Sequence, residues 1–263
     1  MNIIINGPGR SGTTLLSRLL SHQKDLAWIS GWVNRYPHIP QLSFLNCLYR
    51  KKVFIHDFSE VSKFPKPAEA YNFWNFYIKN FQSGYELSIG ELHKLRKAIE
   101  IIISWQNKKH FVTKVTGDLR ENIFDKTFSS YKLVWVERDP RVVVSSYVKQ
   151  KWFYKNKLQE FNKMSNTDKV KFYSNYYMKI YNQPKPIDCM IVFYEDLCDN
   201  RIKFFENLLQ RLDLEFTETH KNRITNKDIK KVDWSHYEKK FTDDEVMLLN
   251  ELLNKPLIKY GYI

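Results

Sequence analysis

Short runs of β-branched and other apolar residues recur along the chain, separated by turns and longer polar stretches. The first run covers residues 3–5, and later ones cover 111–115, 133–136 and 190–193, with a weaker run at 27–29. Strands buried on both faces of a parallel sheet have this continuous apolar character. The pattern therefore predicts five short strands of one buried sheet.

Helical periodicity occupies much of the chain between these runs. Directly after the first run, residues 13–21 place Leu15, Leu16, Leu19 and Leu20 on one helix face. Apolar residues at helical spacing also recur within 95–103, 170–180, 202–212 and 246–253. Alternating strands and helices predict an α/β fold with three layers, a central parallel sheet with flanking helices. We expect one domain over 1–263, with elaborations near 31–95 and 149–185.

Composition narrows the class of protein. Apolar residues make up 43% of the 263 residues and aromatic residues 16%, which excludes a disordered chain. The three cysteines (Cys47, Cys189 and Cys198) are far apart, so we expect no disulfide framework and a reducing, cytoplasmic location. No apolar run is long enough for a membrane span, and the first residues do not resemble a signal peptide.

The net charge of +13 leaves several kinds of partner open. Nucleic acid, an acidic surface and a small anionic ligand would each suit a basic protein. A Lys-rich solvated surface with no partner at all explains the charge equally well. Charge alone therefore does not indicate a function.

A glycine-rich loop joins the first strand to the first helix, with the sequence GPGRSGTT at Gly7–Thr14. Glycines permit tight turns and close backbone approach, and the helix N-terminus offers free N–H groups to an anion. Hydroxyl groups and one guanidinium add further donors. The loop therefore predicts a site for a phosphate or sulfate group, formed by Gly9, Arg10, Ser11, Gly12, Thr13 and Thr14.

The same loop partly matches the Walker A pattern, G-x-x-x-x-G-K-[ST]. Gly7, Gly12 and Thr14 fit this pattern, but Thr13 stands where the lysine should be. Because that lysine holds the terminal phosphates in P-loop enzymes, its absence counts against nucleoside triphosphate chemistry.

Gly7–Leu16 resembles the 5′-phosphosulfate loop of sulfotransferases that use 3′-phosphoadenosine 5′-phosphosulfate (PAPS). The arginine at position 10 is similar to the tyrosylprotein and glycan branches of that family, since the phenol branch usually carries lysine. The resemblance implies a sulfotransferase fold related to P-loop nucleotide hydrolases. It also implies PAPS as donor, 3′,5′-ADP as product and no metal.

Two later segments resemble further family motifs. The strand at 133–136 leads into Arg138-Asp139-Pro140-Arg141 and a helix, which is similar to the 3′-phosphate motif. Its clamp would be formed by Arg138 and by Ser146, eight residues later. In the Tyr-Glu-Asp-Leu segment at 194–197, Tyr194 would lie near the adenine, although a core aromatic is an equally good interpretation. Lys230 and Lys231 are weaker candidates for the 3′-phosphate, since a solvated lysine pair explains them better.

The resemblance implies in-line transfer of a sulfuryl group, in which Arg10 stabilises the charge that develops on the oxygens. Lys114 would help at the sulfate, as the lysine of the phenol branch does. The general base is open, because the positions that carry it in relatives hold no acid or histidine here. Glu69 is one candidate and Asp118 another, although a first-turn acid favoured by a helix dipole explains Glu69 better.

The acceptor is expected to be a carbohydrate or glycan precursor. Several aromatic residues could stack on sugar rings, although core packing is an alternative for each: Trp32, Tyr36, Trp74, Trp105 and Trp152. Two other functions remain as rivals, a P-loop kinase or ATPase and a basic nucleic-acid-binding protein. The second is suggested by the alternating cations and aromatics of 149–157. We expect neither a nucleic-acid partner nor a membrane span.

Overall fold

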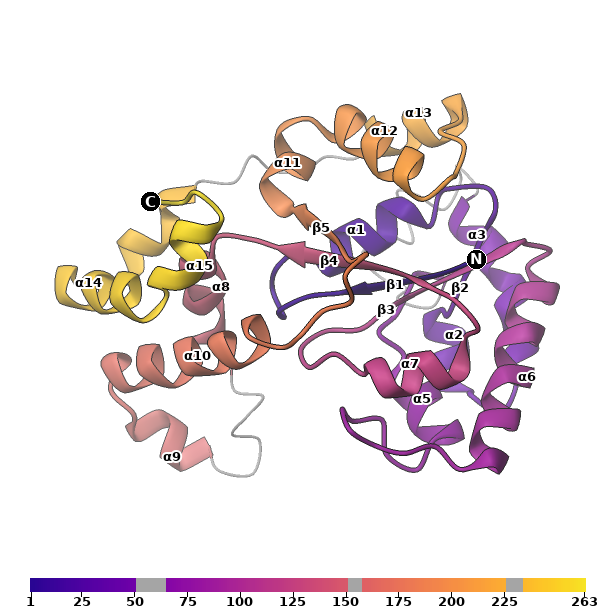
Figure 1. Cartoon of the computed structure of the whole chain (residues 1–263), viewed down its shortest axis with the longest axis horizontal. Coiled ribbons are helices and arrows are strands. Elements are labelled where there is room, and N and C mark those ends of the chain that lie inside the picture. The colour runs from indigo at the N-terminus through magenta and orange to yellow at the C-terminus, as the bar shows by residue number, and fades with distance from the viewer. Residues whose placement is uncertain (51–64, 151–157, 226–233) are drawn as a thin grey trace.

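The computed structural model describes residues 1–50, 65–150, 158–225 and 234–263 of the chain (Figure 1). Its centre is a five-stranded parallel sheet in the order β2-β3-β1-β4-β5. The strands are β1 (Asn2–Asn6), β2 (Leu26–Trp28), β3 (His110–Lys114), β4 (Lys132–Glu137) and β5 (Met190–Phe193). All five predicted strands and the parallel sheet are confirmed.

Alternate residues of β1 face two different helical layers, as the period of two in a strand requires. Ile3 and Ile5 pack with α1 (Thr13–Leu20) and α12 (Arg201–Arg211) on one face of the sheet. Ile4 faces the opposite layer, which contains α5 (Tyr71–Tyr77), α6 (Ile89–Trp105) and α7 (Glu121–Thr127). Because both faces are covered, the middle of each strand is mainly apolar, and the charged Lys114 and Glu137 stand at the carboxyl ends of β3 and β4.

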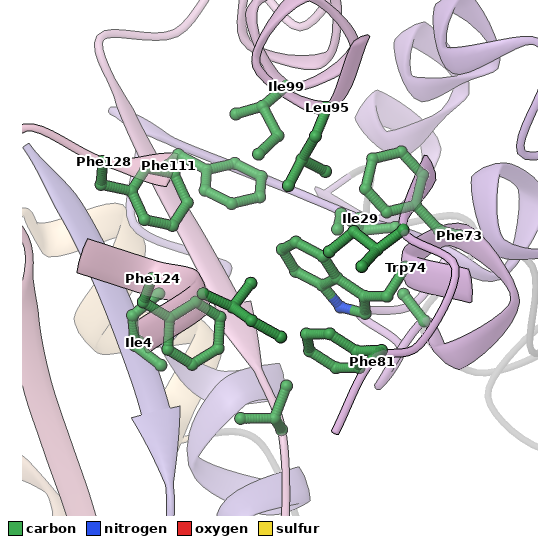
Figure 2. Packing of buried hydrophobic residues seen from close by; sticks show 14 of the residues in the cluster. Ile4, Ile29, Phe73, Trp74, Phe81, Leu95, Ile99, Phe111, Phe124 and Phe128 are labelled. Atoms are coloured by element: carbon green, nitrogen blue, oxygen red, sulfur yellow. The ribbon is translucent and has the colours of Figure 1, made fainter. Parts of the chain in front are cut away.

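The layer that faces Ile4 is rich in aromatic rings (Figure 2). The rings of Trp74 and Phe81 stack with centroids 4.7 Å apart, and Phe124 meets both from α7. The α5 segment, which the sequence assigned to an elaboration, thus supplies fully buried side chains to the main core. The division of the chain into core and elaborations stays a prediction.

A third group of helices lies beside the sheet at its left end in Figure 1. It has its own apolar cluster and consists of α8 (Pro140–Tyr147), α9 (Leu158–Lys163), α10 (Asn166–Tyr181), α14 (Asp243–Leu252) and α15 (Asn254–Lys259). The remaining elements are α2 (Gly31–Arg35), η1 (Pro40–Asn46), α3 (Cys47–Arg50), α11 (Tyr194–Asp199), α13 (Glu218–Thr225) and η3 (Trp234–Lys240). No helix in the described ranges is long and apolar enough to cross a membrane.

The strand order determines where a ligand can bind. From β1 the chain crosses to β2 and β3 on one side of the sheet, and after β3 it passes to β4 and β5 on the other. The loops that leave β1 and β4 therefore diverge in opposite directions. The crevice at such a switch point, at the carboxyl ends of the strands, is the usual ligand site of open α/β sheets.

Candidate active site

The glycine loop follows β1 at this switch point and leads directly into α1. Ser11 is fully buried, and its hydroxyl has no hydrogen-bond partner among the described residues. The N–H groups of the first helical turn also lack intrahelical acceptors. A buried hydroxyl beside free N–H groups suits an oxyanion such as the 5′-phosphosulfate of PAPS, so the loop residues fit the predicted donor.

Gly12 shows why this loop requires glycine. Its φ is 101°, and a Cβ at this position would lie 2.1 Å from Cδ2 of Tyr194. Any side chain would therefore collide with a ring whose backbone is fixed at the start of α11. The close approach of Tyr194 brings the end of β5 against the glycine loop.

Arg10 connects the glycine loop to the segment after β4. Its Nε donates to Oγ of Ser146 on α8 at 2.9 Å. Its carbonyl oxygen accepts a hydrogen bond from Nη1 of Arg138 at 3.2 Å. The residues predicted separately for the two ends of the donor therefore lie in one site, although they are more than 120 residues apart in sequence.

The guanidinium group of Arg138 is positioned by an aromatic ring as well as by the loop. It lies over Tyr194, 4.5 Å from the ring centroid, in cation–π geometry. Burial lowers the pKa of Arg138, while Tyr194 and Glu195 act in the opposite direction. Tyr194 is thus placed between Gly12 and Arg138, and its contact with adenine stays a prediction.

A second charged cluster lies at the end of β3. Nζ of Lys114 donates to Oγ1 of Thr14 at 2.9 Å and to Oε1 of Glu69 at 2.6 Å. Thr116 donates to the same Oε1 at 3.0 Å. Burial lowers the pKa of Lys114, and the charge of Glu69 partly offsets that effect. Lys114 therefore meets the glycine loop at its helical end, and Glu69 is joined to the loop through Lys114.

The structure corrects two sequence-based interpretations. Glu69 is not a first-turn acid, because α5 begins at Tyr71 and Ala70 adopts a left-handed conformation with φ of 58°. Trp74 is fully buried in the core, so it cannot stack on a sugar at the surface. Asp118, the other candidate base, accepts hydrogen bonds from Nε2 of Gln183 at 2.7 Å and from Nζ of Lys179 at 3.3 Å, and its role stays a prediction.

Two cations near the site were not predicted. Nζ of Lys240 lies 3.4 Å from Oγ of Ser145, and its pKa is lowered by burial and then by the charges of Lys149 and Arg138. Arg18 is close enough to Lys114 to lower its pKa. The spacing of Arg18, one helical turn after Thr14, could have predicted its place near the site, because residues four apart lie on the same face of a helix. Nothing in the sequence around Lys240 indicated that it packs against α8.

Some predictions lie outside the described residues, namely Lys230, Lys231, Trp152 and most of the basic aromatic stretch 149–157. Of the aromatic acceptor candidates that are described, Tyr36 is 40% exposed and Trp105 53%. Within the described ranges, no three His, Cys, Asp or Glu side chains are grouped to hold a metal ion.

Comparisons with known proteins agree with this fold. A model described as the sulfotransferase family matches residues 2–218. The solved structure of sulfotransferase STF9 from Mycobacterium avium is 14% identical, with a TM-score of 0.57, and the match covers 98% of this chain and 76% of that one. Sulfotransferase STF1 from Mycobacterium tuberculosis H37Rv is 15% identical, with a TM-score of 0.58, covering 95% and 75%. These likenesses confirm the predicted fold. A search of curated proteins finds no significant match.

Proposed function

Because the chain belongs to the sulfotransferase family, we propose that it transfers a sulfuryl group from PAPS to a hydroxyl group of a carbohydrate or glycan precursor. The observation that carries the proposal is the hydrogen bond between Arg10 and Ser146 at 2.9 Å. It joins the loop suited to the 5′-phosphosulfate to the helix suited to the 3′-phosphate.

The donor-binding residues divide into two groups by position. Gly9, Ser11, Gly12, Thr13 and Thr14 would surround the 5′-phosphosulfate with backbone N–H groups and hydroxyls, and Arg10 would add its guanidinium. Arg138 and Ser146 would hold the 3′-phosphate, and Lys240 lies close enough to Ser145 to contribute charge there. PAPS, when bound, supplies an activated sulfuryl group whose leaving group is 3′,5′-ADP.

Glu69 is the proposed general base. Its two hydrogen bonds with described residues go to Oε1, so Oε2 is available to accept the proton of an acceptor hydroxyl. Deprotonation of that hydroxyl accompanies formation of the new S–O bond. Lys114 and Arg10 would stabilise the negative charge that builds on the sulfuryl oxygens and the leaving oxygen.

A carbohydrate acceptor is supported by the aromatic residues that follow residues 29–31, a segment paired with the residues just before Glu69. Residues 66–68 run antiparallel beside 29–31, where the Gly31 N–H donates to the Lys66 carbonyl and the Ala68 N–H to the Ile29 carbonyl. Trp32 comes directly after this pairing, and the exposed Tyr36 follows at the end of α2. Aromatic faces such as these are suited to stacking against a sugar ring.

The acceptor class is tested by supplying PAPS labelled in its sulfuryl group to the protein with sugars, phenols and tyrosine peptides. We expect label on a sugar hydroxyl. Label on phenols or peptides with none on any sugar would contradict the proposed acceptor and leave the donor assignment standing.

The three cysteines are free thiols, which supports the proposed cytoplasmic location.

A further inference from the structure

Two consecutive residues of α8 contact two consecutive residues of the glycine loop. Ser146 accepts the hydrogen bond from the side chain of Arg10. Tyr147 is fully buried and packs against Gly9. A Cβ built at Gly9 would lie 3.2 Å from the Tyr147 hydroxyl oxygen and 3.4 Å from Cε1, so the phenol is in close contact with the loop backbone.

The loop backbone at this point has a conformation that requires support. Arg10 has a φ of 68°, in the left-handed region that a residue with a side chain rarely adopts. Such a conformation persists only where surrounding contacts determine it. Arg138 holds the carbonyl of Arg10 on one side, and Tyr147 meets Gly9 on the other.

The environment of Tyr147 keeps its hydroxyl neutral and directed at the loop. Its ring packs against Tyr173, with centroids 5.7 Å apart, and against Tyr176, at 5.8 Å. Burial raises the pKa of Tyr147, so the phenol stays neutral. Its hydroxyl oxygen would lie 3.2 Å from a Cβ at Gly9, so the hydroxyl of this fully buried side chain faces the loop and not solvent.

We propose that Tyr147 is a positioning residue, whose hydroxyl holds Gly9 so that Arg10 and the loop amides face the 5′-phosphosulfate of the donor. This inference rests on the proposed function, because the loop must be the donor site for its conformation to matter. Tyr147 touches neither donor nor acceptor in this account and acts only through Gly9.

The test compares two ligands that differ only at the 5′ position. 3′,5′-ADP carries a 5′-phosphate for the glycine loop, and adenosine 3′-phosphate carries none. The Kd of adenosine 3′-phosphate divided by the Kd of 3′,5′-ADP, both measured by titration calorimetry, reports what the loop contributes to binding. In Tyr147→Phe we expect this ratio to shrink about tenfold, because the loop then holds the 5′-phosphate with poorer charge-assisted hydrogen bonds. The Kd of adenosine 3′-phosphate should stay within about twofold.

Tyr173→Phe is the matched control. Tyr173 is equally buried in the same ring cluster, but its hydroxyl donates to the carbonyl of Gln150 at 2.6 Å. Its loss should leave the ligand ratio unchanged. A second measurement uses Gly9→Ala, whose new methyl group would crowd the Tyr147 hydroxyl. The ratio should fall less when Gly9→Ala is made in Tyr147→Phe than in the wild type, because that hydroxyl is then absent.

Three results would overturn the proposal. These are a ratio in Tyr147→Phe within twofold of the wild-type ratio, equal losses in both phenylalanine variants, and effects of Gly9→Ala and Tyr147→Phe that simply add. Failure of the proposed function would be seen in the wild-type protein, before any variant is compared. A wild-type protein that binds both ligands equally, or neither, would show that the loop does not bind the donor.

Discussion

At the scale of single residues, the site depends on an arginine in an unusual conformation. A left-handed non-glycine residue costs about 1–3 kcal/mol and is typical of functional sites. Arg10 has φ of 68° and is held by Ser146 and Arg138. The loop motif predicted that Arg10 binds the donor, but no local pattern predicts this conformation, because its supports come from distant parts of the chain.

Arg10→Ala should lower kcat about 100- to 1,000-fold, the usual effect of removing one donor to developing negative charge. The free energy of unfolding should fall little, because the arginine side chain is exposed. Arg211→Ala, an exposed arginine at the end of α12, is the control and should retain full activity. Activity of Arg10→Ala near the wild-type level would show that this guanidinium has no catalytic role.

Glu69→Gln should lower kcat about 100- to 10,000-fold, the range for a lost general base. It should also move the alkaline loss of activity to lower pH. Burial already lowers the pKa of Lys114, so the wild-type enzyme should lose activity at a pH below 10.5, the ordinary pKa of lysine. The charge of Glu69 raises the pKa of Lys114, so removing that charge should lower this pKa further. Rate–pH profiles check both effects.

Glu86→Gln provides the matched control for this experiment, because Glu86 is an exposed carboxylate paired with Lys126. Its profile should match that of the wild type. An alkaline limb that stays in place in Glu69→Gln would contradict the coupling between Glu69 and Lys114.

At the scale of elements, the apolar runs predicted all five strands because each is buried on both faces. The sequence could not predict that Glu69 precedes its helix, since the left-handed Ala70 that delays α5 has no side-chain signature. Nor could it place η3 against α8, because that contact depends on long-range packing. The helix that was best predicted is α1, expected over 13–21 and found over Thr13–Leu20. In α8, Pro140 and the Asp139 cap mark the start.

The cap of α8 gives a prediction at this scale. Asp139 accepts the N–H of Arg141 at 2.9 Å, and its other carboxylate oxygen pairs with Nη2 of the same arginine at 2.8 Å. Asp139→Ala should lower the free energy of unfolding by about 1 kcal/mol more than Asp139→Asn, because asparagine still caps the helix. Chemical denaturation measures the difference. Equal losses would show that the ion pair, and not the cap, stabilises α8.

At the scale of the whole molecule, the charge of +13 acquires a partial explanation. Arg10, Arg138, Lys114 and Lys240 lie around the proposed donor site, and the sequence predicted three of them. The molecule also contains a buried carboxylate, Glu137, which joins β4 to two helices of the neighbouring group.

Glu137 should make the stability of the whole protein depend on pH. It is fully buried and accepts hydrogen bonds from Trp135 at 2.7 Å, Tyr177 at 3.2 Å and Tyr260 at 3.1 Å. Burial nevertheless raises its pKa above the ordinary 4.5. The folded state therefore binds the proton more tightly than the unfolded state, and the free energy of unfolding should fall as pH rises above about 4.5.

Glu137→Gln should reduce that fall, as measured by denaturation at a series of pH values. Glu215→Gln, which changes a carboxylate that is 64% exposed, should leave the pH profile unchanged. A wild-type profile that is retained in Glu137→Gln would show that other groups cause the dependence.

The crevice between the β1 and β4 loops is the proposed site of a 3′-phosphorylated adenosine donor. The most direct measurement is thermal unfolding with 3′,5′-ADP, compared with ATP and GTP in the presence of Mg²⁺. At 100 times its Kd, 3′,5′-ADP should stabilise the protein by about 2.7 kcal/mol and raise Tm by a few degrees. ATP and GTP should raise it less. No stabilisation by 3′,5′-ADP, or greater stabilisation by ATP or GTP, would contradict the account.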